Sequence, residues 1–439
     1  MTVISPEAGC GSPSVAEDPL ARNVTAQLLH GTFGQAGQRL FAAPTFLPVF
    51  LFTLTGSELL VGVARGLQGF GTVLSPPLGA ALIGHRARVK WLGIAVGLAS
   101  RAQILVIAAA VLWLDPASAV WVVLGALTLL GFFSGIQSVA FNALRARVIP
   151  RRRRGLVLGA RNFAGGIAAA LLAAWAGPAL LGSAPELTAW ALLFAVAFVV
   201  STAGLLGLAL TRETGPVELA PRRGLRATFA AGTETLRSEP GFARFFTAYV
   251  LGSIGRMGIP FYVLHAAERL GTPDGVLPGA LLGALTTIWL LTGTTTRLLW
   301  GTVGDRRGHR DVFLAGLALW ILAQLLLMTT DGVGSLFVFF TLAGLAIGGF
   351  ETAANNLVVE YGRLSDLPLR LAALTSAVHA VAALAPVLGG VIATVAGYTP
   401  ILVVCVIGQS IALAIIIRTV PEPRDGHPVL ATHTQETQP

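Results

Sequence analysis

The chain has 439 residues, of which 54% are hydrophobic and 12% are charged, and its mean hydropathy is +0.75. This composition excludes an ordinary soluble domain and predicts an all-α integral membrane protein. The net charge of +9 comes largely from arginines in short connections between apolar runs, so we interpret it as a signal of membrane topology and expect no nucleic-acid binding.

The apolar runs are long enough to cross a bilayer as helices, which takes about 20 residues each. Residues 1–23 are polar and lack a basic segment followed by an apolar one, so we expect a cytoplasmic N-terminal tail. A connection at 211–242, with several prolines and glycines, separates an N-terminal half (24–210) from a C-terminal half (243–420), and 421–439 form a cytoplasmic tail. The twelve predicted transmembrane helices are 24–53, 59–83, 90–113, 119–144, 156–180, 187–210, 243–267, 279–303, 311–330, 335–358, 370–395 and 399–418.

The distribution of arginine predicts the orientation of these helices. Connections after even-numbered helices hold clusters such as 151–154, whereas those after odd-numbered helices hold almost no basic residue beyond Arg269. Since basic loops stay in the cytoplasm, both termini are expected there, in a multi-pass protein of a bacterial plasma (inner) membrane.

Short segments of the two halves correspond in a consistent order. The fourth helix contains GIQSVAFN (135–142) and the tenth contains GFETAANN (349–356). The second helix leads into LGAALIGHRAR and the eighth into GTVGDRRGHR, so that Gly79 matches Gly301 and Arg88 matches Arg310. This order indicates an internal repeat of six helices.

Two six-helix halves and the loop of Gly301, Asp305, Arg306, Gly308 and Arg310 resemble the major facilitator superfamily of secondary transporters. The resemblance implies twelve helices in two pseudo-symmetric halves, a central cavity lined by helices 1, 4, 7 and 10, and a conformational latch in this loop. We expect Gly301 to admit a neighbouring helix, Asp305 to end helix 8 and Gly308 to permit a tight turn. The competing interpretation is that the arginines only anchor the loop at the membrane surface.

Several charged or titratable residues lie inside predicted helices, where a charge costs about 2.5–3.5 kcal/mol. Glu351 is our candidate for proton coupling, and the alternative is a static ion pair with Arg256 or Arg297. His379 is either part of a proton relay or a packing residue. The residues expected along the substrate and proton pathway are Arg39, Gln137, Asn142, Arg256, Glu351, Asn355 and His379, while Arg65, Arg161 and Arg297 lie nearer helix ends and are expected to snorkel.

The two positive charges of Arg39 and Arg256 exceed the single negative charge of Glu351, which predicts a positively charged interior that would attract an anion. We therefore expect a transporter that moves a small organic, anionic solute by alternating access and is driven by a proton or other ion gradient. Its partners are that solute and the lipid bilayer, a monomer suffices, and no cofactor, metal or enzyme activity is expected because the sequence lacks the corresponding motifs. The alternatives are efflux of amphipathic metabolites or drugs, and a receptor or scaffold that no longer transports.

Overall fold

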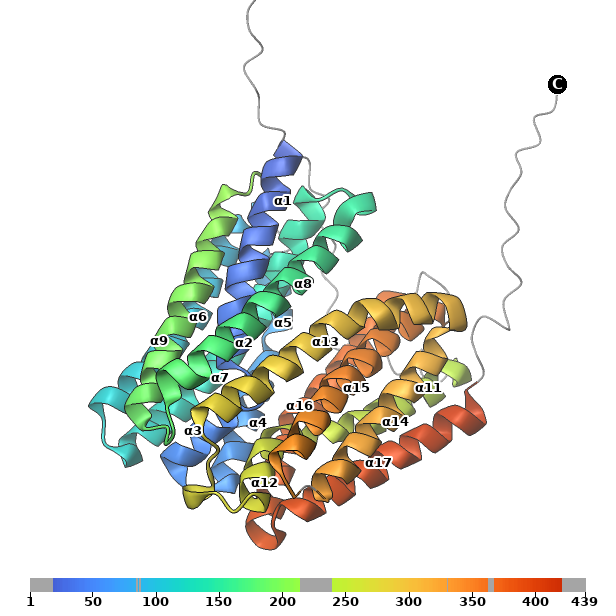
Figure 1. Ribbon diagram of the computed structural model, residues 1–439. Coiled ribbons are helices and arrows are strands. Elements are labelled where there is room, and N and C mark those ends of the chain that lie inside the picture. Colours follow the sequence, from blue (N-terminus) through green and yellow to red (C-terminus); the bar gives the residue numbers. More distant parts are fainter. Residues whose placement is uncertain are drawn as a thin grey trace, which may run out of the picture.

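The computed structural model describes residues 19–83, 86, 88–213, 239–329, 331–361 and 367–420, and Figure 1 shows that they form two groups of helices. This part of the chain contains helices and no strand, which confirms the all-α class. The predicted tails lie largely outside the described residues, as does most of the linker.

The N-terminal half begins with a broken helix. It consists of α1 (Pro19–Leu29), a π-helical turn η1 (His30–Gly34), α2 (Gln35–Phe41) and α3 (Phe46–Thr55). Pro44 lies in the break and Pro48 in the first turn of α3, where a missing N–H costs nothing. The half continues with α4 (Glu58–Leu74), α5 (Pro76–Ile83), α6 (Lys90–Trp113), α7 (Pro116–Val148), α8 (Arg151–Ala176) with η2 (Gly177–Leu181), and α9 (Leu187–Gly207) with η3 (Leu208–Leu210).

The C-terminal half also begins with a distorted helix. Two short 3₁₀ turns, η4 (Ser253–Met257) and η5 (Ile259–Phe261), separate α11 (Pro240–Gly252) from α12 (Tyr262–Arg269). After the turn η6 (Pro273–Gly275), the longer helices are α13 (Gly279–Arg307), α14 (His309–Met328), α15 (Val333–Glu360), α16 (Leu367–Ala396) and α17 (Tyr398–Thr419).

Eight of the described helical segments are long and apolar enough to cross a membrane. The others are interrupted, as in the first and seventh predicted spans, or carry more polar residues, as in α13. Together the described helices are compatible with the twelve predicted spans. Large apolar side chains such as Trp113, Trp121 and Val395 are exposed on the exterior, as expected for a surface in contact with lipid.

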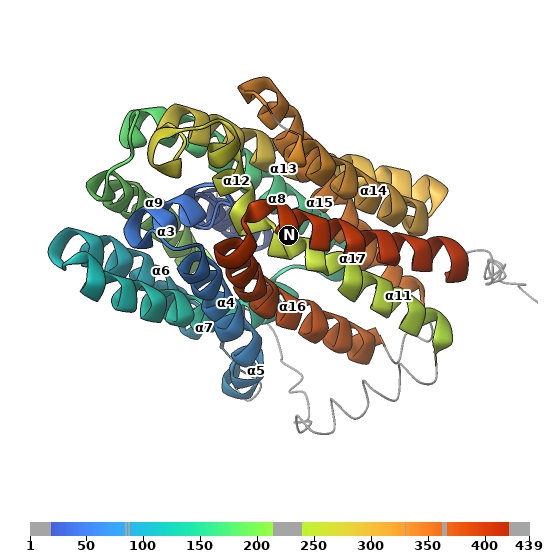
Figure 2. The same cartoon turned by 90° about the horizontal axis from the view of Figure 1, so that it is seen from below.

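The two halves pack against each other at one end of the molecule. There α8 lies along α13, and α4 lies along α16, as Figure 2 shows from below. Glycines allow this approach, since a Cβ built on Gly177 would lie 2.5 Å from the carbonyl oxygen of Gly279, and one on Gly62 would lie 2.3 Å from that of Pro386. The Gly279 amide also donates to the Gly182 carbonyl at 2.8 Å.

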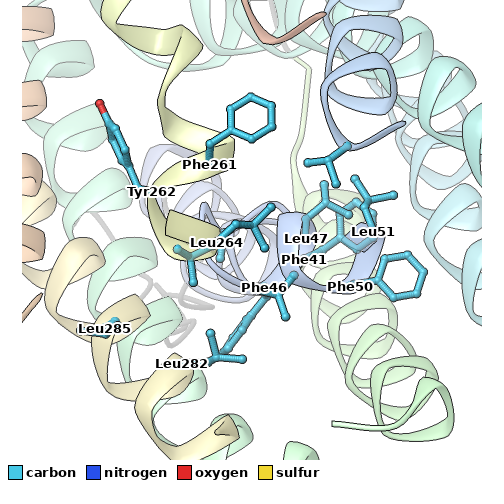
Figure 3. Close-up of a cluster of buried hydrophobic side chains, with 14 of the residues drawn as sticks. Phe41, Phe46, Leu47, Phe50, Leu51, Phe261, Tyr262, Leu264, Leu282 and Leu285 are labelled. Carbon is cyan, nitrogen blue, oxygen red and sulfur yellow. The ribbon is translucent and has the colours of Figure 1, made fainter. Parts of the chain in front are cut away.

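A buried apolar cluster seals the same end. Figure 3 shows Phe41, Phe46 and Phe50 from the N-terminal half together with Phe261 and Leu282 from the C-terminal half. The Thr45 and Thr286 hydroxyls, one from each half, also form a buried hydrogen bond. Toward the opposite end, where α8 begins and α13 finishes among arginines, the two groups of helices diverge (Figure 1).

Candidate functional site: the central cavity

A cavity of about 610 Å³ lies between the two halves. Its walls come from α2 and α8 of the N-terminal half and from α13 and α15 of the C-terminal half. The polar lining side chains are Gln35, Gln38, Arg39, Asn162, Thr294 and Arg297, and the larger apolar ones are Phe163, Trp289, Leu290 and Ile347. This mixture of apolar wall and a few polar groups is typical of a small-molecule site.

Arg39 is held in the cavity wall by a chain of side-chain hydrogen bonds. Its Nη2 donates to Gln35 Oε1 at 2.8 Å, and Gln35 Nε2 donates to Asn162 Oδ1 at 3.0 Å. Residues four apart share a helix face, which places Gln35 and Arg39 together, while Asn162 arrives from α8. The neutral amide of Gln35 thus orients the Arg39 guanidinium. Neither Gln35 nor Asn162 carries a negative charge, so this chain of hydrogen bonds does not neutralise Arg39.

Glu351 on α15 binds two arginines. Its Oε1 accepts from Arg256 Nη2 at 3.0 Å, and its Oε2 accepts from Arg297 Nη2 at 2.6 Å. The structure thus realises both ion pairs that the sequence offered as alternatives, and it ties together η4, α13 and α15. The side chain of Glu351 retains 24% of its exposure, and its partner Arg297 lines the cavity. Its role in proton coupling stays a prediction.

The charges around the cavity do not balance. Arg39 and Arg297 line it, and the ion pairs of Glu351 join Arg297 to Arg256, so this group of residues carries three positive charges and one negative charge. Charged groups away from bulk water are normally paired, so this excess favours an anionic guest.

Arg39 is the one predicted pathway residue among the residues that line this cavity. Arg256 and Glu351 are linked to the lining through Arg297, and the other four lie elsewhere. Gln137 is buried beside α6, where a Cβ built on Gly97 would lie 2.5 Å from its Nε2, and its place on the substrate path stays a prediction. Asn142 is exposed near the end of α7, where it accepts a hydrogen bond from Arg145. Asn355 is exposed one turn beyond Glu351, and His379 is half-buried on α16.

The loop between α13 and α14 partly matches its predicted geometry. Gly308 has a φ of +99°, which confirms the tight turn that favours glycine. The expected role of Gly301 is wrong, because a Cβ there would meet no atom within 4 Å. The close contact occurs at Gly304 instead, where an added Cβ would lie 2.6 Å from the ring of His309. Asp305 does not end the helix, since α13 continues to Arg307.

The basic residues of this loop make contacts within the C-terminal half. Arg310 donates to the carbonyl oxygens of Val420 at 2.6 Å and Ile416 at 3.3 Å, which caps the end of α17. His309 Nδ1 lies 2.8 Å from Glu360 Oε1, and its Nε2 lies 4.0 Å from Asp305 Oδ1. Arg306 is exposed. The loop therefore joins α13, α14, α15 and α17, and its opening as a latch stays a prediction.

The expected snorkelling of three arginines is also corrected. Arg161 is buried, with its Nη2 2.9 Å from His30 Nδ1. Arg297 turns to Glu351, and Arg65 donates to Gln68 Oε1 at 2.7 Å. In each case a neighbouring side chain provides the hydrogen-bond acceptor that water at the membrane surface would otherwise supply.

Sequence reasoning missed Gln35 and Asn162. A usable signal was present for the first, since Gln35 precedes Arg39 by one helical turn. No comparable signal marks Asn162, because its place depends on how α8 is rotated against α2.

Comparison with known proteins places the chain in a family. The sequence pattern of the Major Facilitator Superfamily matches residues 28–285 and 245–437. An uncharacterized protein of Mycobacterium tuberculosis is 27% identical over 315 residues, which are 71% of this chain and 59% of that protein. Multidrug resistance protein D of Escherichia coli is 28% identical over 193 residues, 42% of this chain and 46% of the relative. The chain thus spans less than two thirds of the length of these relatives.

Solved structures share the fold at low sequence identity. The nucleoside transporter NupG, as a point mutant, superposes with a TM-score of 0.67 and 14% identity over 91% of this chain and 99% of that one. A bacterial homologue of the iron transporter ferroportin in an inward-facing state has a TM-score of 0.67 and 15% identity over 91% and 98% of the chains. The chain belongs to the Major Facilitator Superfamily, a family of multi-pass membrane transporters rather than enzymes.

Proposed function

We propose that this chain is a secondary transporter that moves a small organic anion with an apolar body by alternating access. The observation that carries the proposal is the pair Arg39 and Arg297, which face one cavity from opposite halves of the molecule. Phe163 and Trp289 in the same walls provide surface for an aromatic or aliphatic body. An anion bound by both arginines would contact both halves at once, so its binding would be coupled to their relative movement.

We further propose that the end rich in arginine lies in the cytoplasm of a bacterial cell, so that the conformation described is open inward. The positive-inside rule supports this orientation, and the apolar seal at the opposite end supports the direction of opening.

Proton coupling follows from competition for Arg297. An anion that binds this guanidinium displaces the Glu351 carboxylate, which is then left in a confined site without one of its two partners. Such a carboxylate favours protonation, so a proton would travel with the anion.

A ligand screen on the purified protein tests the substrate class. Benzoate should raise the melting temperature, since a ligand at 100 times its Kd stabilises a protein by about 2.7 kcal/mol. The Arg39→Gln variant should lose this response, whereas Arg65→Gln, whose guanidinium lies outside the cavity lining, should keep it. Stabilisation of the wild type that persists in Arg39→Gln would refute the assigned site.

Transport in proteoliposomes tests the coupling. In the Glu351→Gln variant, benzoate uptake should no longer respond to an imposed pH gradient. The reason is that an amide, unlike a carboxylate, cannot bind and release the coupled proton. Asp331→Asn is the matched control, since Asp331 is exposed and paired with Arg269 away from the cavity. A response of Glu351→Gln equal to that of the wild type would exclude Glu351 as the coupling residue.

Efflux of amphipathic compounds is the second candidate. Its support is the similarity to multidrug resistance protein D and to the multidrug resistance protein MdtG of Proteus mirabilis, 24% identical over 157 residues. Stabilisation by tetraphenylphosphonium, with no response to benzoate, would favour this function over anion transport.

A further inference from the structure

The N-terminal half contains a second cluster of cationic and polar groups, inside the helix bundle and separate from the lining of the central cavity. Arg101 on α6, His30 in η1 and Gln137 on α7 retain only 0%, 3% and 6% of their exposure. None of them lines the cavity described above.

Arg101 carries a buried charge that no acidic side chain balances among the described residues. Its Nε donates to the Ser201 carbonyl at 2.9 Å and its Nη1 donates to the Gly97 carbonyl at 2.9 Å. Both acceptors are neutral, and Nη2 has no hydrogen-bond partner among the described groups. A buried guanidinium in this state needs a negative partner.

The described acids of the N-terminal half cannot provide that partner. They are Glu58, Asp115, Glu186 and Glu213, which all lie at helix ends or in connections. Glu213, for example, accepts from the amides of Val89 and Lys90 at the start of α6.

The His30 ring provides a second N–H group near the Arg101 guanidinium. An arginine can only donate, so Nδ1, which lies 2.9 Å from Arg161 Nη2, must act as the acceptor. In this arrangement the neutral ring carries its proton on Nε2, a buried atom with no hydrogen-bond partner among the described groups. The π-helical turn η1, a type of distortion often found at functional sites, holds this ring in place.

The other two donors lie near the Arg101 guanidinium, one beside Gly34 and one beside Gly97. A Cβ built on Gly34 would lie 3.2 Å from His30 Nε2 and 3.6 Å from Arg101 Nη2. A Cβ built on Gly97 would lie 2.5 Å from Gln137 Nε2 and 3.2 Å from Arg101 Nη1. The absence of a side chain at both glycines therefore brings the donors together, and Gln137 Nε2 also has no partner among the described groups.

We propose that these groups form a binding site for a small monovalent inorganic anion of the halide class, held between η1, α6 and α7. Such an ion accepts hydrogen bonds from every side and neutralises Arg101. A water molecule fits this site less well, because its own two hydrogens would need acceptors where the surrounding groups donate, and it would leave the charge unbalanced.

Halide titration of the purified full-length chain tests the site, with sodium gluconate used to keep the ionic strength constant. Replacing gluconate by bromide up to about 100 mM should raise the melting temperature by about 1–3 °C. Gln137→Leu, which removes one donor at similar volume, should weaken or abolish this shift. Arg39→Gln should retain it, since Arg39 belongs to the cavity, so the test is independent of the proposed transport function.

The outcomes are distinct. A bromide shift that is kept in Arg39→Gln and lost in Gln137→Leu supports the buried site. A shift lost in Arg39→Gln but kept in Gln137→Leu assigns the halide to the cavity and overturns the proposal, as does the absence of any shift in the wild type. If Gln137→Leu does not fold, an anomalous diffraction peak from bromide beside Arg101 in wild-type crystals supports the site, and its absence refutes it.

Discussion

A single methyl group at Gly177 should shift the balance between conformations of this protein. In Gly177→Ala the added Cβ would lie 2.5 Å from both the Gly279 carbonyl oxygen and the Gly283 Cα, well inside van der Waals distance. These atoms belong to the backbone of the facing helix α13, so no flexible side chain can move aside. Relief requires η2, which follows α8, to separate from α13, and this opens the sealed end.

The size of the effect follows from the cost of overpacking. Forcing a methyl group into a well-packed contact costs about 1–3 kcal/mol, and every 1.4 kcal/mol changes an equilibrium constant about tenfold. We therefore expect the sealed conformation to lose between about fivefold and 150-fold in population relative to one in which this end is open.

Cysteine labelling measures this change. The two native cysteines, Cys10 and Cys405, are replaced by serine, and Asn162→Cys places a reporter in the cavity wall. A membrane-impermeant maleimide applied from the arginine-rich side should label this reporter more slowly in Gly177→Ala than in its parent.

Gly125→Ala is the matched control, because a Cβ at Gly125 meets no atom within 4 Å, and its labelling should equal that of the parent. Unchanged labelling in a folded Gly177→Ala protein would refute the reasoning, since the close contact would then carry no conformational energy.

Three further predictions concern hydrogen bonds and the loop after α13. Tyr262→Phe should destabilise the protein by about 2–4 kcal/mol in thermal unfolding, because the hydroxyl accepts from Trp320 Nε1 at 3.0 Å and Gln324 Nε2 at 2.9 Å and both buried donors would lose it. If the loop acts as a latch, Asp305→Asn should change both the transport rate and the labelling rate of the cysteine reporter at position 162. If neither rate changes, the loop serves only to anchor the helices at the membrane surface. Glu213→Gln should cost about 0.5–1 kcal/mol by weakening the charged cap of α6, and an unchanged melting temperature would contradict that role.

Sequence reasoning found some parts of the site because their signals are local. Glu351 is an acid inside an apolar run, and Arg39 is a base inside another, so their cost in a membrane marks both without any knowledge of packing. The glycine at 308 was also predictable, because a sharp turn between two helices needs a positive φ. The role given to Gly301 failed because closeness to a neighbour depends on which face of α13 turns inward, and Gly304 occupies that face.

Helix rotation decided the remaining assignments. Gln137 lies in a helix that the resemblance placed along the cavity, yet its side chain turns to Gly97, while Asn162 enters the cavity from α8. A helix repeats every 3.6 residues, so a rotation of about 100° replaces one residue by the next on a given face. An apolar helix surrounded by lipid and other apolar helices carries no hydrophobic pattern that fixes this rotation.

The sequence by itself determined that the chain crosses a membrane many times and where its helices lie, because hydrocarbon thickness and the cost of unpaired backbone groups act on every segment separately. The tertiary structure alone decided that Arg39 and Arg297 share a cavity, that Glu351 binds two arginines at once, and that Arg101, His30 and Gln137 meet in the core of one half. These contacts depend on how glycine-rich helices pack against each other. Such packing joins segments that are distant in the sequence, so no local sequence pattern predicts it.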